Sequence, residues 1–360
     1  MLWNPRDQFM TMQGQFQSMR LKDLAEHLGL SQTTVSRALN GYPEVSETTR
    51  QRVNEAAGRL GYRPDASAIR LATGRVGAIG VALPLERTLH FGPHTAEFMS
   101  GIGERLAQDE IDILVAPIDS DDEVPVHQRL AASKRVDAVI LSSPVPDDPR
   151  IRILSEIGMP FILHGRAEEV NLPHAWLDID NEGAFRRATS HLLDLGHRTI
   201  GMVNGPAEQT FALHRERGFR EALRERGITP DPRLIANGRF TDEVGFRHAQ
   251  HFLDQSPRPT AILAGSMMTA LGVFRAIRTA GFELGKDVSM IAHDDVFPYL
   301  NADNMVPSMS TTRSSMRAAG FRIGELVQQL LAGKPAESIH ELWPVELVLR
   351  ESSGPPRNGA

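Results

Sequence analysis

The sequence predicts an α/β protein with a small all-helical unit at its N-terminus, followed by two parallel sheets flanked by helices. Residues 19–63 place apolar side chains at helical spacing between glycines, which favours short packed helices. After residue 75, short apolar strands alternate with amphipathic helices, the pattern of parallel sheets covered on both faces. This alternation occurs twice, so we expect two lobes with a cleft between them.

The composition excludes several classes of protein and of site. Hydrophobic residues make up 41% of the 360 residues, and there is no cysteine, which excludes disulfides, thiolate zinc sites and a cysteine nucleophile. No run of about 18 apolar residues occurs, and the first residues lack the pattern of an export signal. We therefore expect no membrane contact and a cytoplasmic location.

The charge is unevenly distributed. Residues 19–75 carry nine Lys and Arg against six Asp and Glu, whereas residues 76–360 carry 29 against 38. A basic unit on an acidic body suggests that only the front unit meets a polyanion.

The front unit is predicted to hold three helices. The first begins at Leu21, a second covers residues 32–39 and a third covers 47–60. The caps and stops expected around them are Gly29, Ser31, Ser46 and Gly61. Two helices joined by a short glycine turn are typical of a helix-turn-helix DNA-binding unit. An ordinary three-helix bundle with a solvated polar face is the alternative.

The second helix has a polar exposed face that could enter the major groove of DNA, where side chains read base edges. Its members are Gln32, Thr33, Ser36, Arg37 and Asn40. Arg37 could reach a guanine edge or a phosphate.

The runs LKDLAEHLGLSQTTVSRALNG, VSETTRQRV and LGYRPDASAIRLATG closely resemble the DNA-binding headpiece of the lactose-repressor (LacI/GalR) family. The match covers residues 20–75 without a gap. The resemblance implies that Gln32 and Thr33, with Arg37 one turn on, choose the operator sequence. It also implies phosphate contacts from Leu21, Ser31, Thr34, Ser36, Asn40 and Thr49.

Residues 64–75 form a segment between Pro64 and Gly74 that is too short to be a stable isolated helix. The resemblance implies a hinge helix that pairs with its dimer mate in the minor groove, with Ala68 and Leu71 among its DNA contacts and Leu71 as the wedge. Asp65 and Ile69 depart from the family's usual Asn and Arg. A simple linker is the alternative.

The larger domain is predicted to contain eight strands and seven helices. The strands are expected at 76–84, 111–116, 136–143, 160–165, 176–180, 198–205, 260–265 and 288–294. The helices are expected at 94–108, 124–133, 149–157, 181–196, 211–226, 241–255 and 267–280. Ligands of open α/β sheets bind outside the carboxyl ends of the strands, so the residues just after each strand are informative.

The runs DIDNEGAFRRATSHLLDLGHRTIGMVNGP, RERGFREAL and MIAHDD resemble the same family's regulatory domain, which is similar to a periplasmic sugar-binding protein. The resemblance implies effector contacts from Arg215, to sugar hydroxyls, and from Asp294, while Phe240 falls where a ring can stack on a pyranose. Further candidates that could line the cleft are Ser142, Ser266, Arg166, His90, Phe91 and His94. Ser266-Met267 departs from the family's usual Asn-Asp.

Motifs for catalysis are missing from the sequence. There is no P-loop, no GxSxG and no dinucleotide fingerprint, and the 13 histidines lack metal-ligand spacing. Asp294 and Asp295 are adjacent on a strand end and should point in opposite directions. We therefore expect no enzyme activity, no cofactor and no metal. A sugar hydrolase or a periplasmic transport receptor would leave residues 20–75 unexplained.

The predicted function is transcriptional repression of carbohydrate-utilisation genes by a homodimer on pseudo-palindromic operator DNA, with a sugar as inducer. Short segments (AIRLATG, LHGR, TLHF) resemble family members that control α-glucoside use, which favours a disaccharide effector. A corepressor ligand (a sugar phosphate or a purine), or activation at some promoters, is the alternative. The C-terminal residues lack a leucine heptad repeat, so we expect no coiled-coil tetramer.

The expected domain boundaries follow from these patterns. They are a disordered tail (1–18), the helix-turn-helix domain (19–63), the hinge (64–75), the effector-binding and dimerisation domain (76–352) and a second tail (353–360). Within the large domain, we expect the first lobe at about 76–175 and 310–342 and the second at about 176–309 and 343–352.

Overall fold

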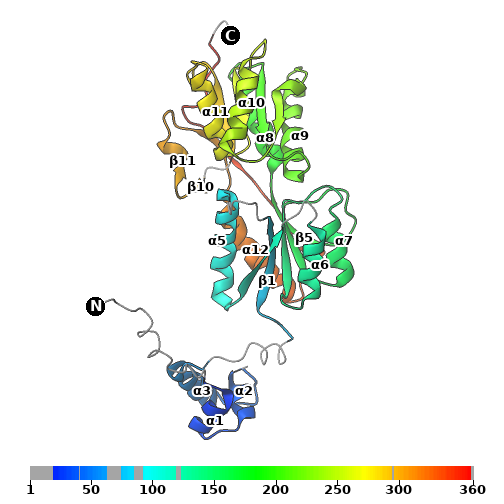
Figure 1. Ribbon diagram of the computed structural model, residues 1–360, viewed down its shortest axis with the longest axis vertical. Coiled ribbons are helices and arrows are strands. Elements are labelled where there is room, and N and C mark those ends of the chain that lie inside the picture. The colour runs from blue at the N-terminus through cyan, green and yellow to red at the C-terminus, as the bar shows by residue number, and fades with distance from the viewer. Residues whose placement is uncertain are drawn as a thin grey trace, which may run out of the picture. The chain divides into compact units, whose positions relative to one another are not determined.

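The computed structural model describes residues 19–39, 41–62, 74–84, 92–118, 123–293 and 296–357 (Figure 1). The chain divides into two compact units, Met1–Val76 and Gly77–Ala360.

The first unit contains the three predicted helices, α1 (Leu21–Leu28), α2 (Gln32–Leu39) and α3 (Glu47–Leu60). Their core is a single apolar cluster made by Leu24, Ala25, Leu28, Val35, Ala38, Val45, Val53, Ala56 and Ala57. The predicted caps are confirmed: the Ser46 hydroxyl accepts from the Thr49 N–H (3.3 Å), and Gly29 has a φ of 64°, the left-handed conformation. Local sequence therefore sets where α1 ends and where α3 begins.

Two arginines of α3 fix the backbone around α2. Arg52 donates to the carbonyl of Leu28 at the end of α1 (2.8 Å), and Arg50 donates to the carbonyl of Tyr42 (3.2 Å) in the connection before α3. These side chains are structural, which separates them from Arg37 on the exposed face of α2.

The predicted hinge lies largely outside the described residues. Residues 63–73 are not described, so the expected contacts of Ala68 and Leu71 stay predictions, as does that of Asn40. Gly74 and Arg75, at the end of the segment, are exposed.

The second unit begins with a six-stranded, all-parallel sheet in the order β13-β5-β4-β3-β1-β2. Its strands are β1 (Ala78–Pro84), β2 (Asp112–Ile118), β3 (Ala138–Ser142), β4 (Phe161–His164), β5 (Ala175–Ile179) and β13 (His340–Trp343). The helices that cover it are α5 (Pro93–Leu106), α6 (Val124–Ala132), α7 (Pro149–Ile157) and α12 (Met316–Leu331). Helices α5 and α12 lie side by side in Figure 1 and pack on one apolar core with the strands. This is the first lobe.

A second six-stranded sheet, in the order β14-β12-β9-β8-β6-β7, forms the second lobe. Its strands are β6 (Ile200–Asn204), β7 (Ile235–Asn237), β8 (Ala261–Ala264), β9 (Ser289–His293), β12 (Ser310–Arg313) and β14 (Glu346–Val348). All pairings are parallel except that of β12 with β14. The covering helices are α8 (Asn181–Asp194), α9 (Thr210–Glu225), α10 (Asp242–Leu253) and α11 (Met267–Thr279).

Smaller elements connect these layers. A hairpin of β10 (Val296–Phe297) and β11 (Leu300–Asn301) follows the second-lobe strand β9. Short 3-10 helices cover Ala107–Asp109, Pro232–Leu234, Ala302–Asn304 and Ala336–Ser338.

Glycines let the covering helices pack in close pairs. A Cβ on Gly101 of α5 would overlap the backbone of α12, and a Cβ on Gly320 of α12 would overlap the backbone of α5. Gly245 and Gly272 make the same close approach between α10 and α11. Backbone contact at these points fixes the helix spacing in both lobes.

The strand pairings show that the chain passes from one lobe to the other a few residues later than the predicted boundaries. Strand β5 pairs with β4 in the first sheet, although residues from 176 were expected in the second lobe. Strand β12 pairs with β9 in the second sheet, although the chain was expected to re-enter the first lobe at 310. An apolar strand pattern shows burial but not the sheet that the strand joins, which explains the first difference. The second arises because β12 has the sequence STTR, which carries no apolar strand pattern.

The predicted C-terminal tail is also partly wrong, because its first residues are part of the second lobe. The Gly354 N–H donates to the Ser289 hydroxyl (3.0 Å), and His197 Nε2 donates to the Gly354 carbonyl (2.9 Å). Arg357 pairs with Asp287 at 2.6 Å. The sequence predicted a tail from residue 353, but hydrogen bonds and an ion pair hold Gly354 and Arg357 against the second lobe.

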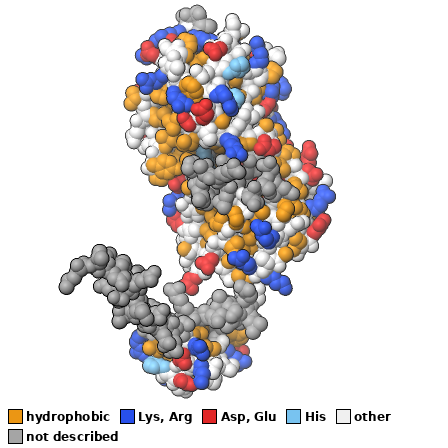
Figure 2. All heavy atoms as spheres, in the orientation of Figure 1, with side chains coloured by type: hydrophobic (Ala, Val, Ile, Leu, Met, Phe, Trp, Pro, Cys, Tyr) orange, Lys and Arg blue, Asp and Glu red, His pale blue; other side chains and the backbone are white. Residues whose placement is uncertain are grey.

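Basic and acidic side chains are intermixed over the face of both lobes shown in Figure 2. Among the helices in the described ranges, none combines the length and apolar character needed to cross a membrane.

Candidate functional site

Arg215, the predicted sugar-gripping residue, is buried near the start of α9, with 4% of its surface exposed. Its Nε donates to Asn181 Oδ1 (2.7 Å), and one terminal nitrogen donates to the Gly265 carbonyl (2.9 Å). A guanidinium held by two hydrogen bonds in fixed directions is pre-oriented, so little side-chain entropy remains to be lost when a ligand binds.

Three phenyl rings surround this guanidinium. Its central carbon lies 4.7 Å from the ring centre of Phe211, 5.2 Å from that of Phe185 and 5.8 Å from that of Phe240. Cation–π attraction is strongest where water is excluded, as it is around a buried arginine. The rings therefore stabilise the charge and leave an apolar surface beside a strong donor.

Phe240 extends this aromatic cluster to the first lobe. Its ring lies 5.5 Å from that of His94, in the first turn of α5, and His94 in turn lies 5.1 Å from Phe297 in an edge-to-face arrangement. Phe240 and Phe297 belong to the second lobe and His94 to the first, so aromatic contacts cross the lobe junction beside Arg215.

Arg166 follows β4 as predicted, but its side chain pairs within its own lobe. Its Nε donates to Asp178 Oδ2 at 2.9 Å, and its guanidinium lies 5.5 Å from the Trp176 ring centre. Asp178 is 3% exposed and is 3.5 Å from the amide of Asn181, the partner of Arg215. A chain of polar contacts thus joins the two predicted arginines.

The two predicted serines have structural partners in this arrangement. Ser266 is fully buried and caps α11, where its hydroxyl accepts from the Thr269 N–H (3.1 Å). The backbone carbonyl of Ser142 accepts from Arg150 (3.2 Å). Their contacts to an effector stay predictions. Asp294, His90 and Phe91 lie outside the described residues.

The first unit presents the predicted reading residues on its surface. Gln32, Thr33 and Arg37 on α2 are exposed, and Thr33 and Arg37 share one face because they are four residues apart. A helix with a polar, exposed face suits entry into the major groove.

Hydroxyl groups flank this face at the predicted phosphate-contact positions. Ser31 Oγ and Thr34 Oγ1 are 2.8 Å apart, as are Ser46 Oγ and Thr49 Oγ1. Leu21 and Ser36 are half-buried. Each hydroxyl pair lies at a helix N-terminus, where backbone N–H groups favour an anion.

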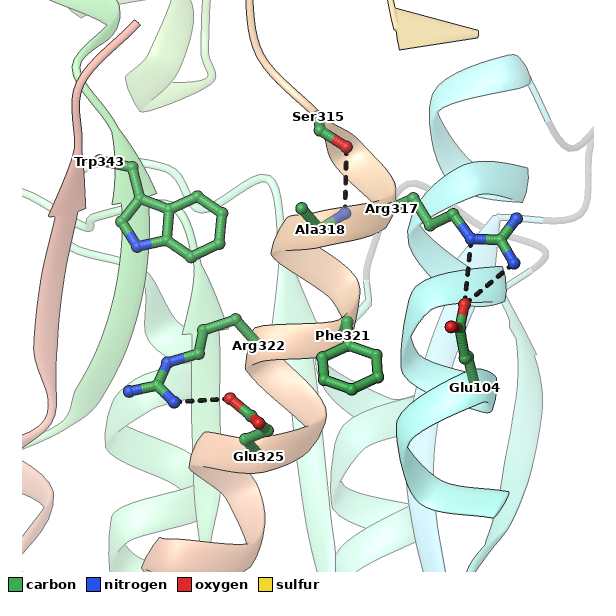
Figure 3. Close-up of a pocket in the computed structure, with 8 residues that line it drawn as sticks. All are labelled: Glu104, Ser315, Arg317, Ala318, Phe321, Arg322, Glu325 and Trp343. Atoms are coloured by element: carbon green, nitrogen blue, oxygen red, sulfur yellow. Dashed lines mark hydrogen bonds and ion pairs between the residues drawn. The ribbon is translucent and has the colours of Figure 1, made fainter. Parts of the chain in front are cut away.

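A separate surface pocket of about 460 Å³ lies on the first lobe and holds none of the predicted effector residues (Figure 3). Figure 3 shows Trp343 on one side of α12 and Glu104 on the other. Its charges are paired with one another: Arg317 with Glu104 at 3.0 Å and Arg322 with Glu325 at 2.6 Å. Within the described ranges, no group of three or more His, Asp or Glu side chains could hold a metal ion.

Both units match models of known protein families. Residues 20–65 match the family model "Bacterial regulatory proteins, lacI family". Residues 78–342 match the model "Periplasmic binding proteins and sugar binding domain of LacI family". The chain belongs to the LacI family. As a LacI-family member it is a DNA-binding transcription regulator and not an enzyme.

LacI-family relatives match over nearly the whole chain. The HTH-type transcriptional regulator AglR of Rhizobium meliloti (strain 1021) is 44% identical over 94% of this chain and 95% of its own. A complex of the transcriptional regulator CelR with cellobiose is 29% identical, with a TM-score of 0.68 over 93% of this chain and 99% of that one. A Lac repressor dimer bound to operator and the anti-inducer ONPF is 26% identical, with a TM-score of 0.78 over 94% and 99% of the two chains.

Several residues of this LacI-family site escaped the sequence interpretation. They are Asn181, Phe185, Phe211 and Phe297, which position or surround the side chains discussed above. Phe211 had a usable signal, because it lies at the start of α9 just after a strand loop, four residues before Arg215. Phe297 had none, because the short hairpin that carries it shows no periodicity.

Proposed function

We propose that this regulator is a sugar-responsive repressor, and that the aromatic cluster around Arg215 is where the sugar binds. The observation that supports this most directly is the combination of a fixed guanidinium with the phenyl rings of Phe211 and Phe240. Arginine N–H groups suit hydroxyl oxygens, and a phenyl face suits the apolar C–H face of a pyranose.

The sugar that fits the proposal is an α-glucoside disaccharide. Aromatic rings continue from Phe211 through Phe240 to His94 and Phe297, a row along which more than one sugar ring would bind. The related CelR structure carries cellobiose, a disaccharide of glucose. Asp294, the other predicted effector contact, would add a carboxylate acceptor.

On DNA, the proposed partner is a pseudo-palindromic operator bound by a homodimer. The related Lac repressor structure is a dimer bound to operator, which supports the dimer. Gln32, Thr33 and Arg37 would read base edges in each half-site, while the flanking hydroxyls and Asn40 would contact phosphates. Leu71 and Ala68 would act at the operator centre. This role belongs in the bacterial cytoplasm, on nucleoid DNA.

The proposed mechanism is a competition between the two ligands. Sugar that contacts both His94 in the first lobe and Phe240 in the second would stabilise one arrangement of the lobes, which would be unfavourable for the hinge on DNA. Each ligand must then weaken the other by the same factor.

A ligand screen with an operator readout tests the proposal. Maltose, sucrose and trehalose, with cellobiose, glucose 6-phosphate and hypoxanthine as comparisons, would be tested for a rise in melting temperature. The active compound would then be added to the protein on a duplex selected from a random library, with binding followed by fluorescence anisotropy. Release of the duplex supports an inducer. Tighter binding would make the ligand a corepressor, and a response only to phosphate or purine compounds would overturn the sugar assignment.

A further inference from the structure

Helix α9 of the second lobe carries a row of side chains that faces the first lobe. Thr210, His214 and Arg217 are spaced by four and three residues, which puts them on one side of the helix. Arg215, the proposed sugar contact, is on the same helix but directed into the aromatic cluster. One rigid element therefore joins the ligand site to a lobe–lobe contact.

The first contact of the row is to the loop after β3. Thr210 donates to the Pro144 carbonyl twice, from its backbone N–H (2.9 Å) and from its hydroxyl (3.0 Å). Thr210 is 1% exposed, so the contact is dry.

The other two residues converge on Glu168, in the loop after β4. His214 Nε2 donates to Glu168 Oε1 (2.9 Å), and Arg217 donates to both carboxylate oxygens (3.1 and 3.2 Å). Burial acts to raise the pKa of the Glu168 carboxyl, but the hydrogen bonds from His214 and Arg217 outweigh it and lower that pKa. One carboxylate of the first lobe is thus held by two side chains of the second.

The surroundings show how this contact could open. Arg217 also pairs with Glu182 of its own lobe at 3.2 Å, so it keeps a partner when Glu168 moves away. His214 is buried, its Nδ1 has no hydrogen-bond partner among the described residues, and Asp178 Oδ2 lies 4.0 Å from it. Thus the lobes can separate without leaving Arg217 unpaired.

We propose that Glu168 is a positioning residue that, with His214 and Arg217, sets the population of the closed lobe arrangement. The inference rests on the proposed sugar site for its functional meaning. The apparent affinity of a ligand that binds only the closed arrangement is proportional to the fraction of molecules that are closed. Glu168 would therefore tune the response without touching the ligand.

The sequence contains no cysteine, so spin labels can be attached at introduced cysteines alone, which allows a direct test. Spin labels on Glu156→Cys in α7 and Arg224→Cys in α9, both exposed positions, report the lobe–lobe distance in the ligand-free, full-length protein. In this background, Glu168→Gln is compared with Glu169→Gln, the same change at the exposed neighbouring residue. Thr210→Val, which removes only the hydroxyl contact, is a second probe.

The expected result is a shift of the distance distribution to longer values for Glu168→Gln and Thr210→Val, and none for Glu169→Gln. Arg217→Gln should shift it too, and the double variant Glu168→Gln/Arg217→Gln should shift it no further, because the two side chains form one contact. A distribution for Glu168→Gln, or for Arg217→Gln if the first variant folds poorly, that matches Glu169→Gln would overturn the proposal. This readout needs no sugar, so it stands apart from any failure of the sugar assignment.

Discussion

The rings of His94 and Phe240 lie 5.5 Å apart across the junction of the two lobes. Phe240 also lies 5.8 Å from the guanidinium carbon of Arg215, so one ring touches both the opposite lobe and the fixed donor. A ligand that stacks on Phe240 would therefore contact both lobes, which is what a lobe-closing effector must do.

Phe240→Ala should weaken sugar binding roughly ten-fold, about 1.4 kcal/mol, the scale of a well-placed aromatic contact. Operator affinity without sugar should not change. Phe274→Ala, at a half-buried position on α11, is a matched control that should leave both affinities unchanged. Isothermal titration calorimetry gives the sugar affinity, and equal losses in the two variants would remove Phe240 from the site.

Arg215→Lys should abolish the sugar response while operator binding remains. A lysine keeps the charge but lacks the planar fork that contacts Asn181 and Gly265. Arg215→Ala should also lower the free energy of unfolding by about 1–3 kcal/mol, because those two acceptors lose their donor. Urea unfolding measures the second effect; a stable Arg215→Ala protein that still responds to sugar would contradict both statements.

The helices and strands with regular apolar spacing could be predicted from the sequence, because that spacing and the helix caps depend on residues close together in the chain. Ser31, Ser46 and Gly29 predicted the helix ends of the headpiece, whereas Arg215 was predicted from the resemblance to the family's regulatory domain. Helix α12 was not predicted, although its apolar positions are helical, because the strand–helix alternation before it already seemed complete. Contacts such as Asn181 with Arg215 or Glu168 with His214 join residues 34 and 46 positions apart, and only folding brings them together.

Substitutions of Arg37 and of Arg52 should have different effects on DNA binding. Arg37→Ala should lower operator affinity and relax the preference at one base pair, at about 1–3 kcal/mol per lost base contact. Arg52→Ala removes the bond to the Leu28 carbonyl, so it should lower headpiece stability and leave base preference unchanged. Competition among duplexes with single base changes distinguishes them; identical preference profiles for wild type and Arg37→Ala would be evidence against base reading.

The unfolding free energy should fall as the pH drops below about 6.5. Burial lowers the pKa of His197, although its bond to the Gly354 carbonyl acts in the opposite direction. The unfolded chain then takes up a proton at its ordinary pKa near 6.5 before the folded chain does, which favours unfolding. Burial lowers the pKa of His127, His191 and His248 in the same direction.

His197→Gln should reduce that pH dependence. Denaturant unfolding at pH 7.5 and pH 5.5 should show a smaller difference for the variant than for the wild type. An equal or larger difference would mean that His197 is not among the groups responsible.

The opposition between sugar and operator is tested most directly by measuring the operator dissociation constant of the full-length protein by anisotropy, with and without a saturating sugar identified by thermal shift. We expect the dissociation constant to rise by roughly 5- to 150-fold with sugar, and the sugar affinity to fall by the same factor when operator is bound. The Arg215→Lys variant should show neither change. An operator dissociation constant that stays the same, or falls, when the bound sugar saturates the wild-type protein would contradict sugar-induced release.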